Sequence, residues 1–189
     1  MNLQRHRSFI AIFPPRETID TLLLIQSKLK KFNGHIRWEK EEKFHFTLQF
    51  WGDQTEEWLA EIYAEITARL SHTAPFTIAI TNVGCFPNRY SPKIIWAGSE
   101  PKENPELIQL AKTIQQITQQ HGVKPEQKPF HPHITIGRGK GKINPDLLQN
   151  LETITFHPVM FHCSEIRMMK SHLASSGSTY TTLYTIPLT

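Results

Sequence analysis

The sequence carries the same order of secondary-structure patterns twice, and this repeat constrains the fold more than any other feature. In the first copy, helix-spaced and strand-like apolar segments alternate. Thr55 stands where a side chain caps the start of a helix, and Asn33-Gly34 stands where a helix ends. The elements predicted for this copy are a strand over Ser8–Phe13, a helix over about Pro15–Phe32, a strand over Phe44–Trp51, a helix after Thr55 and a strand over Pro75–Val83.

The second copy repeats this order and adds further strands. Asn104-Pro105-Glu106 opens a helix that His121-Gly122 ends, and Asn144-Pro145-Asp146 opens a short second helix. The strands predicted in this copy are Lys93–Ala97, Pro132–Gly137, Thr153–Phe161, Glu165–His172 and Thr179–Ile186, of which the last can belong to either copy.

This duplicated order predicts an α+β fold of two similar lobes that face each other across a cleft, where ligands usually bind. We take a pseudo-twofold axis as the relation between the lobes. We expect one two-lobed domain over residues 1–189, with a first half of about 1–90 and a second half of about 91–189. The proline-containing stretches Asn88–Pro92 and Lys124–Pro129 are predicted loops, and the first is the expected crossover between the halves.

The composition excludes several classes of protein. With 39% hydrophobic and 20% charged residues, the chain fits neither a disordered nor a fibrous class. No run approaches the roughly 20 apolar residues of a membrane span, and no secretion signal is evident. Two cysteines, Cys85 and Cys163, are too few for a disulfide framework, so we expect reduced thiols and a cytoplasmic location. The net charge of +4 favours anionic partners only weakly.

Each copy carries a His-x-Thr motif in its central strand, formed by His45 with Thr47 and by His133 with Thr135. Side chains alternate across a strand, so the histidine and threonine share one face while apolar neighbours occupy the other. A single histidine of this kind is more often a hydrogen-bonded core residue. Two such histidines in matching positions of a repeat predict instead a site in which two imidazoles and two hydroxyls surround one small anion.

Paired imidazoles suit the hydrolysis of a phosphodiester without a metal ion. One takes a proton from water and the other protonates the departing oxygen, because two groups with pKa values near neutrality can hold opposite protonation states. Thr47 and Thr135 are expected to hydrogen-bond the non-bridging oxygens. A strained 2′,3′-cyclic phosphate is the natural substrate, and the motifs alone leave open which histidine is the acid.

A glycine-spaced basic loop follows the second motif, and Arg138 is its candidate phosphate ligand because it lies five residues from His133. The loop differs from a Walker motif, since Ile143 follows its last lysine. His131-Pro132-His133 lacks the accompanying carboxylates of a metal site, so we expect no metal. Trp51, on the predicted face of His45, is a candidate for stacking on a base, as are Phe86 and Tyr90.

Over essentially its whole length the chain resembles the RNA 2′,3′-cyclic phosphodiesterase family, formerly known as bacterial 2′-5′ RNA ligases, within the two-histidine phosphoesterase superfamily. The resemblance is carried by Phe9-Ile10-Ala11-Ile12 with Pro14, Ile36-Arg37-Trp38, Phe44-His45-Phe46-Thr47-Leu48-Gln49-Phe50-Trp51-Gly52, Gly84-Cys85-Phe86-Pro87, Ile95-Trp96-Ala97-Gly98 and Pro129-Phe130-His131-Pro132-His133-Ile134-Thr135-Ile136-Gly137-Arg138.

The resemblance implies two lobes whose antiparallel sheets line the cleft, with helices outside, and a monomeric enzyme that needs no cofactor. It implies that a terminal 2′,3′-cyclic phosphate of RNA is opened to a 2′-phosphate. By the same resemblance, His45 is the proton donor to the leaving 3′ oxygen and His133 is the proton acceptor that activates water.

Two other functions remain open on the sequence alone. The same site run backwards would make a 2′-5′ RNA ligase acting on tRNA halves. A non-catalytic module that binds RNA ends is the other, although a binder has no need for paired imidazoles.

Overall fold

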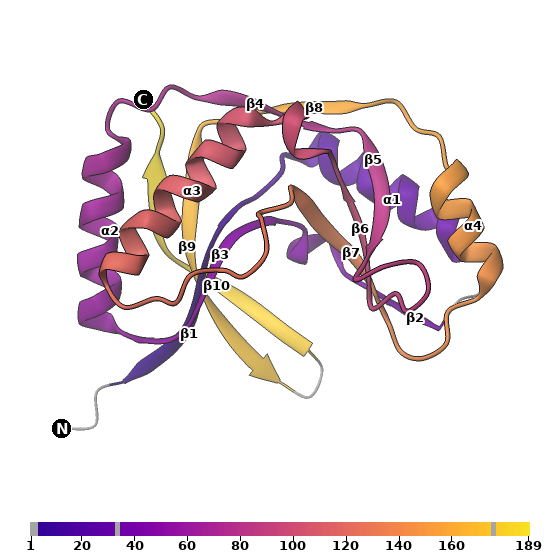
Figure 1. Ribbon diagram of the computed structural model, residues 1–189, viewed down its shortest axis with the longest axis horizontal. Coiled ribbons are helices and arrows are strands. Elements are labelled where there is room, and N and C mark those ends of the chain that lie inside the picture. Colours follow the sequence, from indigo (N-terminus) through magenta and orange to yellow (C-terminus); the bar gives the residue numbers. More distant parts are fainter. Residues whose placement is uncertain (1–3, 33–34, 175–176) are drawn as a thin grey trace.

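A computed structural model describes residues 4–32, 35–174 and 177–189 of the chain (Figure 1). In these ranges the helices are α1 (Arg16–Lys30), α2 (Glu56–Leu70), α3 (Pro105–Gln120) and α4 (Pro145–Thr153), with short 3₁₀ helices η1 (Glu41–Lys43) and η2 (Pro101–Glu103). The strands are β1 (Arg5–Ile12), β2 (Ile36–Trp38), β3 (Phe46–Thr55), β4 (Phe76–Ile80), β5 (Asn82–Phe86), β6 (Ile94–Gly98), β7 (His133–Gly139), β8 (Val159–Cys163), β9 (Glu165–Ala174) and β10 (Gly177–Pro187).

One antiparallel sheet dominates the fold. It has two parts, which are connected at the centre through a single pair of residues. Its strand order is β10-β9-β1-β3-β7-β6-β5, with β2 pairing to β7 outside this path. The pairing between β3 and β7 is formed by Phe46 and Ile134. We therefore distinguish a first wing of β1, β3, β9 and β10 from a second wing of β2, β5, β6 and β7. Strands β4 and β8 form a separate two-stranded sheet.

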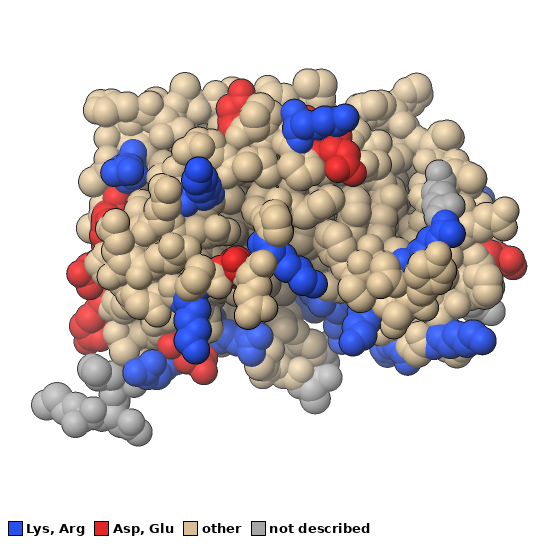
Figure 2. Space-filling view, viewed as in Figure 1, with Lys and Arg blue, Asp and Glu red and all other residues tan. Residues whose placement is uncertain are grey.

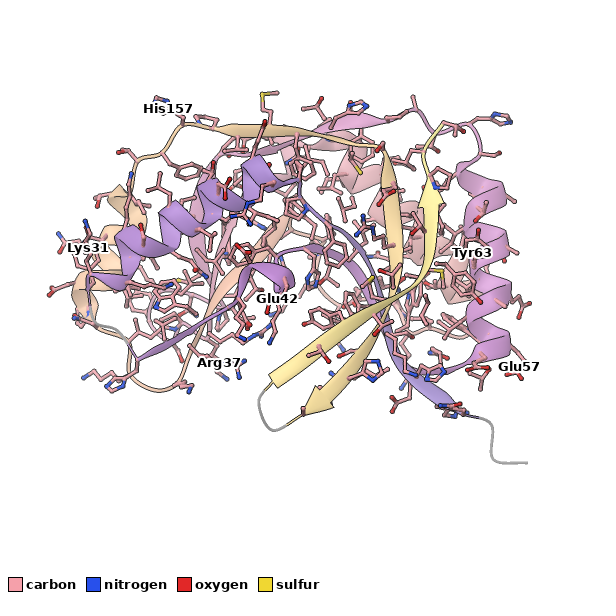
Figure 3. All side chains as sticks on the ribbon, turned by 180° about the vertical axis from the view of Figure 1, so that it is seen from behind. Lys31, Arg37, Glu42, Glu57, Tyr63 and His157 are labelled. Carbon is pink, nitrogen blue, oxygen red and sulfur yellow. The ribbon has the colours of Figure 1, made fainter. Side chains whose placement is uncertain are left out.

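Helices cover the outer faces of both wings (Figure 1). Helices α2 and α3 pack against the first wing, and Tyr63 of α2 lies against the strands, where it stacks on Tyr184 of β10 at 4.4 Å between ring centroids (Figure 3). On the second wing, Gln26 of α1 donates to the carbonyl oxygen of Ile136 at 2.7 Å, and α4 packs against β5. The expected α+β class with antiparallel sheets and outer helices is confirmed.

The two halves of the chain interleave between the wings. Strands β9 and β10, from the second half, complete the first wing, whereas β2, from the first half, pairs with β7 in the second. A division near residue 90 therefore does not separate the wings. Element order repeats along the chain, but strand pairing is decided by non-local contacts that this order does not encode.

The main hydrophobic core fills the space between the sheet and its helices. Strand alternation sends Ile10, Ile12, Phe46 and Ile134 into this core, each at most 1% exposed. The opposite face of β1 carries a small second cluster of Phe9 and Ala11 with Met169. Strand β1 is thus apolar on both faces, and its second face lies on the side of the cleft, where Phe9 contacts His45.

Helix starts and stops follow local side-chain chemistry. The Thr55 hydroxyl accepts a hydrogen bond from the Trp58 backbone N–H at 3.2 Å, which confirms it as the cap of α2. Helix α3 ends at the predicted His121-Gly122, where Gly122 has a φ of +84°. The Asn33-Gly34 stop predicted for α1 lies outside the described residues.

Three strand predictions differ from the structure. The first part of the strand expected over Thr153–Phe161 is wrong, because α4 continues to Thr153 and β8 begins only at Val159. Buried Leu147 and Leu151 anchor α4, residues 154–158 form no regular element, and Pro158, which lacks a backbone N–H, directly precedes β8. The segment expected as one strand over Pro75–Val83 divides into β4 and β5, and β2 was not predicted.

Candidate active site

The two His-x-Thr motifs lie side by side at the junction of the wings. Phe46 and Ile134 are antiparallel partners, and both are fully buried on the core face. Their sequence neighbours therefore point to the opposite face. The antiparallel register places His45 beside Thr135 and Thr47 beside His133, which is the arrangement that a local twofold axis through the pair produces.

All four side chains line one cleft of about 950 Å³. Arg138 and Phe86 line the same cleft, together with three residues that sequence reasoning did not single out, Glu39, Lys43 and Tyr180. The structure thus brings together His45, Thr47, His133, Thr135 and Arg138, as predicted from the motifs.

Both imidazoles are anchored by the same backbone contact. Nδ1 of His45 lies 2.7 Å from the carbonyl oxygen of Lys43, and Nδ1 of His133 lies 2.8 Å from that of His131. A carbonyl oxygen only accepts, so each Nδ1 carries the hydrogen and donates it. In the neutral ring Nε2 then holds the lone pair, so Nε2 is the atom of each histidine that exchanges a proton with a ligand.

Aromatic rings surround both histidines. His45 contacts Phe9 at 5.1 Å and Tyr180 at 5.3 Å between ring centroids, and the Tyr180 ring meets it edge-on. His133 meets Phe86 edge-on at 5.1 Å. These rings leave both imidazoles partly buried at the wall of the cleft and limit their motion.

This burial lowers the pKa of both histidines. It takes the pKa of His45 from 6.5 to about 4, although the Lys43 carbonyl raises it and a positive charge on nearby His133 lowers it further. The pKa of His133 is lowered for the same main reason, although its hydrogen bond to the His131 carbonyl raises it and positive charge on His131 and Arg138 lowers it further. Both rings are therefore neutral at pH 7 in the unliganded protein, and a bound anion would favour their protonation.

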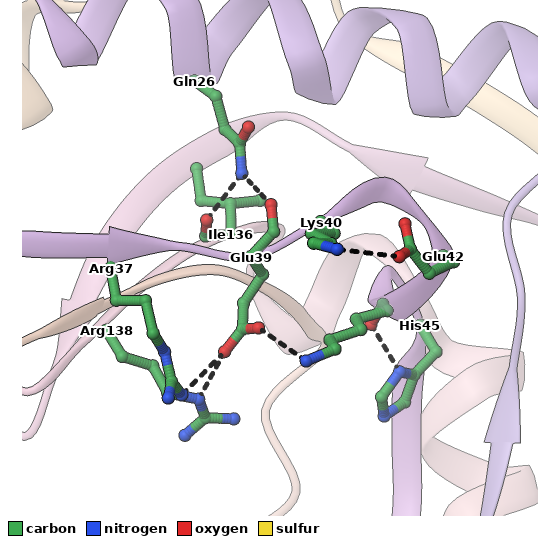
Figure 4. Close-up of polar contacts among 9 residues, drawn as sticks. Gln26, Arg37, Glu39, Lys40, Glu42, His45, Ile136 and Arg138 are labelled. Carbon is green, nitrogen blue, oxygen red and sulfur yellow. Dashed lines mark hydrogen bonds and ion pairs between the residues drawn. The ribbon is translucent and has the colours of Figure 1, made fainter. Parts of the chain in front are cut away.

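Arg138 is held beside the cleft by a buried carboxylate. Its Nε donates to Oε1 of Glu39 at 2.7 Å, and the Glu39 side chain is only 8% exposed (Figure 4). Arg37 Nη2 lies 3.6 Å and Lys43 Nζ 3.9 Å from the same carboxylate. The Glu39 carbonyl oxygen accepts from Gln26 of α1 at 2.8 Å, which fixes the backbone beneath the cluster.

A β-bulge follows the threonine in each motif. On β3, Thr47 and Gln49 pair with adjacent residues of β1, so Leu48 is the extra residue. On β7, Thr135 and Gly137 pair with adjacent residues of β6, so Ile136 is the extra residue. Each bulge reverses the alternation beyond it, which brings Phe50 and Arg138, both five residues after a histidine, to the cleft.

The prediction that Trp51 binds substrate is wrong. Trp51 is 6% exposed, and its ring packs edge-on against Trp58 of α2 at 5.3 Å in the main core. Its Nε1 donates to Gln49 Oε1 at 3.0 Å. Strict alternation from His45 placed Trp51 on the cleft face, because it did not take the bulge at Leu48 into account. Phe50, which is 59% exposed, occupies the cleft side instead.

The other two aromatic candidates are separated by the fold. Phe86 lines the cleft beside His133, where a base could stack on it. Tyr90 is 85% exposed and lines a different hollow near Lys142.

Sequence reasoning missed four residues of the cleft. Lys43 and Glu39 lie shortly before His45. The charged run at residues 39–43 was the signal in the sequence that could have pointed to them. Phe50 required knowledge of the bulge. Tyr180 had no local signal, because β10 reaches the cleft only through its pairing with β9 and, in turn, β1.

Within residues 4–32, 35–174 and 177–189, no group of three or more His, Cys, Asp or Glu side chains is placed to hold a metal ion. Over the same described ranges, no helix has the length and apolar character needed to cross a membrane.

Comparison with known proteins places this chain in a family. A family model described as the 2′-5′ RNA ligase superfamily matches residues 25–174. A relative from Methanothermobacter thermautotrophicus, named RNA 2′,3′-cyclic phosphodiesterase, is 32% identical over 178 residues, covering 93% of this chain and 95% of its own. One of the same name from Thermotoga maritima is 32% identical over 179 residues, covering 94% and 93%. The chain belongs to the 2′-5′ RNA ligase superfamily.

Solved structures share the fold. A protein of Thermus thermophilus superposes with a TM-score of 0.76 at 26% identity, covering 96% of this chain and 97% of its own. Escherichia coli LigT, in a complex with 3′-AMP, superposes with a TM-score of 0.75 at 24% identity, covering 98% and 99%. The second likeness shows the fold alone.

Proposed function

We propose that the protein hydrolyses the terminal 2′,3′-cyclic phosphate of RNA to a 2′-phosphate, with His45 as proton donor and His133 as proton acceptor. One observation carries the proposal: two imidazoles with the same tautomer face one cleft from twofold-related strands. The names of relatives about 30% identical to the chain support the choice of substrate.

In the proposed reaction, Nε2 of His133 takes a proton from water, whose oxygen attacks phosphorus. The bond from phosphorus to the 3′ oxygen breaks, and Nε2 of protonated His45 donates a proton to that oxygen. His45 is left with hydrogen on Nδ1, which is the tautomer that the Lys43 carbonyl favours. The product keeps its phosphate on the 2′ oxygen, and proton exchange with water resets both rings.

Thr47, Thr135 and Arg138 are proposed to bind the non-bridging oxygens of the phosphate. Their role is to hold phosphorus between the two Nε2 atoms. The phosphate charge also raises the pKa of His45 above its unliganded value of about 4, which favours the protonated acid in the complex.

We further propose that the protein acts as a monomer in the cytoplasm on RNA or nucleotides with cyclic phosphate ends. Cys163 is a buried thiol, which suits a reducing compartment.

The test is turnover of each 2′,3′-cyclic mononucleotide in the presence of a chelator, with the position of the phosphate in the product identified by NMR. We expect a 2′-phosphate, and loss of turnover in His45→Ala and in His133→Ala. His157→Ala, which changes an exposed histidine remote from the cleft, is the matched control (Figure 3). Near-full activity in either cleft variant would overturn the proposal.

Ligation through a 2′-5′ bond is a second candidate, favoured by the family description. It is the reverse reaction, in which a 5′-hydroxyl replaces water. Because water is present at about 55 M, hydrolysis is expected to dominate unless the second RNA end is held in place. Equal pools of cyclic-ended and 5′-hydroxyl fragments would reveal ligation as a joined product.

A further inference from the structure

A second groove, of about 390 Å³, adjoins the cleft that contains the two histidines. The two hollows share the residues Glu39, Lys43, Phe50, Arg138 and Tyr180, so they form one continuous surface. A ligand whose reacting phosphate lies between the histidines can therefore extend into the groove without leaving the protein.

The groove is strongly cationic. Its lining contains Arg7, Arg37, Lys43 and Arg138 against Glu39 as the one carboxylate. The walls come from β1, β2, β3 and β7 and from the β9–β10 hairpin, which projects at the lower centre of Figure 1. Figure 2 shows Lys and Arg side chains on both sides of the hollow beside this hairpin. In Figure 3, Arg37 lies on the same edge of the molecule as the hairpin.

Glu39 makes this cluster a built site instead of a chance gathering of surface charges. Its side chain is 8% exposed and binds Arg138 at 2.7 Å, with Arg37 and Lys43 within 4 Å. One buried carboxylate needs one counter-charge, yet three cations converge on it, and Arg7 adds a fourth to the groove. The positive charge that Glu39 does not neutralise is held in place and can bind an anion.

The two ends of the combined surface differ in chemistry. The histidine cleft contains the apolar side chains of Phe86, Pro87 and Phe130 beside Lys93 and Lys128, whereas the groove is lined by four cations. A nucleotide likewise has an apolar planar base and charged phosphates. Phe50, 59% exposed at the junction, presents a ring on which a further base can stack.

We propose that the groove binds the phosphodiester that joins the cyclic-ended nucleotide to the one before it, so that the protein acts on oligonucleotide ends in preference to mononucleotides. This inference rests on the proposed function. Arg7 and Arg37 are the cations that line the groove and not the histidine cleft, and Arg7, unlike Arg37, has no ion pair with Glu39, so a change at Arg7 tests the groove alone.

The experiment compares kcat/KM for a cyclic-ended dinucleotide with kcat/KM for the corresponding cyclic mononucleotide. For the wild-type protein we expect the dinucleotide to be favoured by about tenfold at low salt, and less at high salt, where charge pairs are screened. Arg7→Gln should lower the dinucleotide value by roughly five- to tenfold and change the mononucleotide value by less than about twofold.

Arg5→Gln is the matched control. Arg5 is an exposed arginine two residues away on the same strand, its guanidinium donates to the Asp53 carbonyl oxygen, and it does not line the groove. This variant should keep the wild-type preference, and equal thermal unfolding midpoints would show that both variants are folded.

The outcomes separate the two proposals. Turnover of both substrates with equal kcat/KM in the wild-type protein, or an equal loss in Arg7→Gln and Arg5→Gln, would overturn the groove and leave the proposed function standing. No turnover of either substrate would overturn the proposed function, and the inference with it.

Discussion

The β3 side and the β7 side of the site share one backbone geometry but differ in what surrounds each histidine. Both strands place a histidine, a threonine and then a bulge, and both imidazoles donate to the carbonyl of the second residue before them. Five residues after the histidine, however, β3 presents Phe50 and β7 presents Arg138. The first side thus presents an aromatic ring to the cleft and the second a guanidinium group.

The backbone symmetry supplies two equivalent imidazoles, and the side chains that surround them differ. His45 is packed against Phe9, Phe13 and Tyr180, and its pKa falls to about 4. His133 has Phe86 on one side and a second histidine, His131, as a neighbour. The following four predictions test this comparison.

The greatest loss of activity is expected at the two histidines, whose roles a second substrate separates. His45→Ala and His133→Ala should each lower kcat for a cyclic nucleotide by about 10²- to 10⁴-fold. On a phosphodiester with a 4-nitrophenyl leaving group, the phenolate departs without a proton. His45→Ala should therefore recover most of the wild-type rate on that substrate, whereas His133→Ala should not. Recovery in His133→Ala instead would reverse the assigned roles.

A second prediction tests the bulge that distinguishes neighbouring residues of β3. Trp51→Ala should lower the free energy of unfolding by about 3–5 kcal/mol, because it empties a core site. Phe50→Ala should change it by less than about 1 kcal/mol, since that side chain is 59% exposed. Denaturant unfolding measures both values. A large loss in Phe50→Ala with none in Trp51→Ala would contradict the described register.

A third prediction concerns pH and His45. Its pKa is about 4 when folded and near 6.5 when unfolded, so the unfolded chain binds the proton more readily between these values. Stability should therefore fall as the pH is lowered from 6.5 to 4, with a contribution from His45 of up to roughly 3 kcal/mol. The free energy of unfolding of His45→Gln should depend less on pH in this window. Parallel curves for the variant and the wild-type protein would show that the ring is not buried.

The mildest effect is expected at the anion ligand of the β7 side. Glu39→Gln removes the charge that orients Arg138 and should raise KM by roughly three- to tenfold while kcat changes little. Glu42→Gln, at an exposed glutamate paired with Lys40 at 3.9 Å, is the control and should keep the wild-type KM (Figure 4). A change in kcat with an unaltered KM would argue against a positioning role for Glu39.

Local patterns in the sequence were sufficient for the centre of the site. The spacing of His45 to Thr47 and of His133 to Thr135 sets which side chains share a strand face, and the repeated element order placed both pairs in equivalent strands. Helix ends such as Thr55 were also predictable, because caps depend on residues close in sequence.

The remaining features depend on contacts between distant segments. The bulge at Leu48 is visible only in the pairing of β3 with β1, and it moved Trp51 to the core and Phe50 to the cleft. The place of Tyr180 follows from the pairing of β10 with β9, and β2 is too short to carry a strand pattern. Periodicity along the chain carries no information about such partners.

Whether one phosphate is held between the two histidines can be measured by an NMR titration of the imidazole nitrogens of His45 and His133. The titrant is a nucleoside 2′-phosphate, the product class of the proposed reaction. We expect both Nε2 resonances to shift along one binding curve and the pKa of His45 to rise on binding. A shift confined to one histidine, or two curves with different dissociation constants, would contradict a single phosphate held between them.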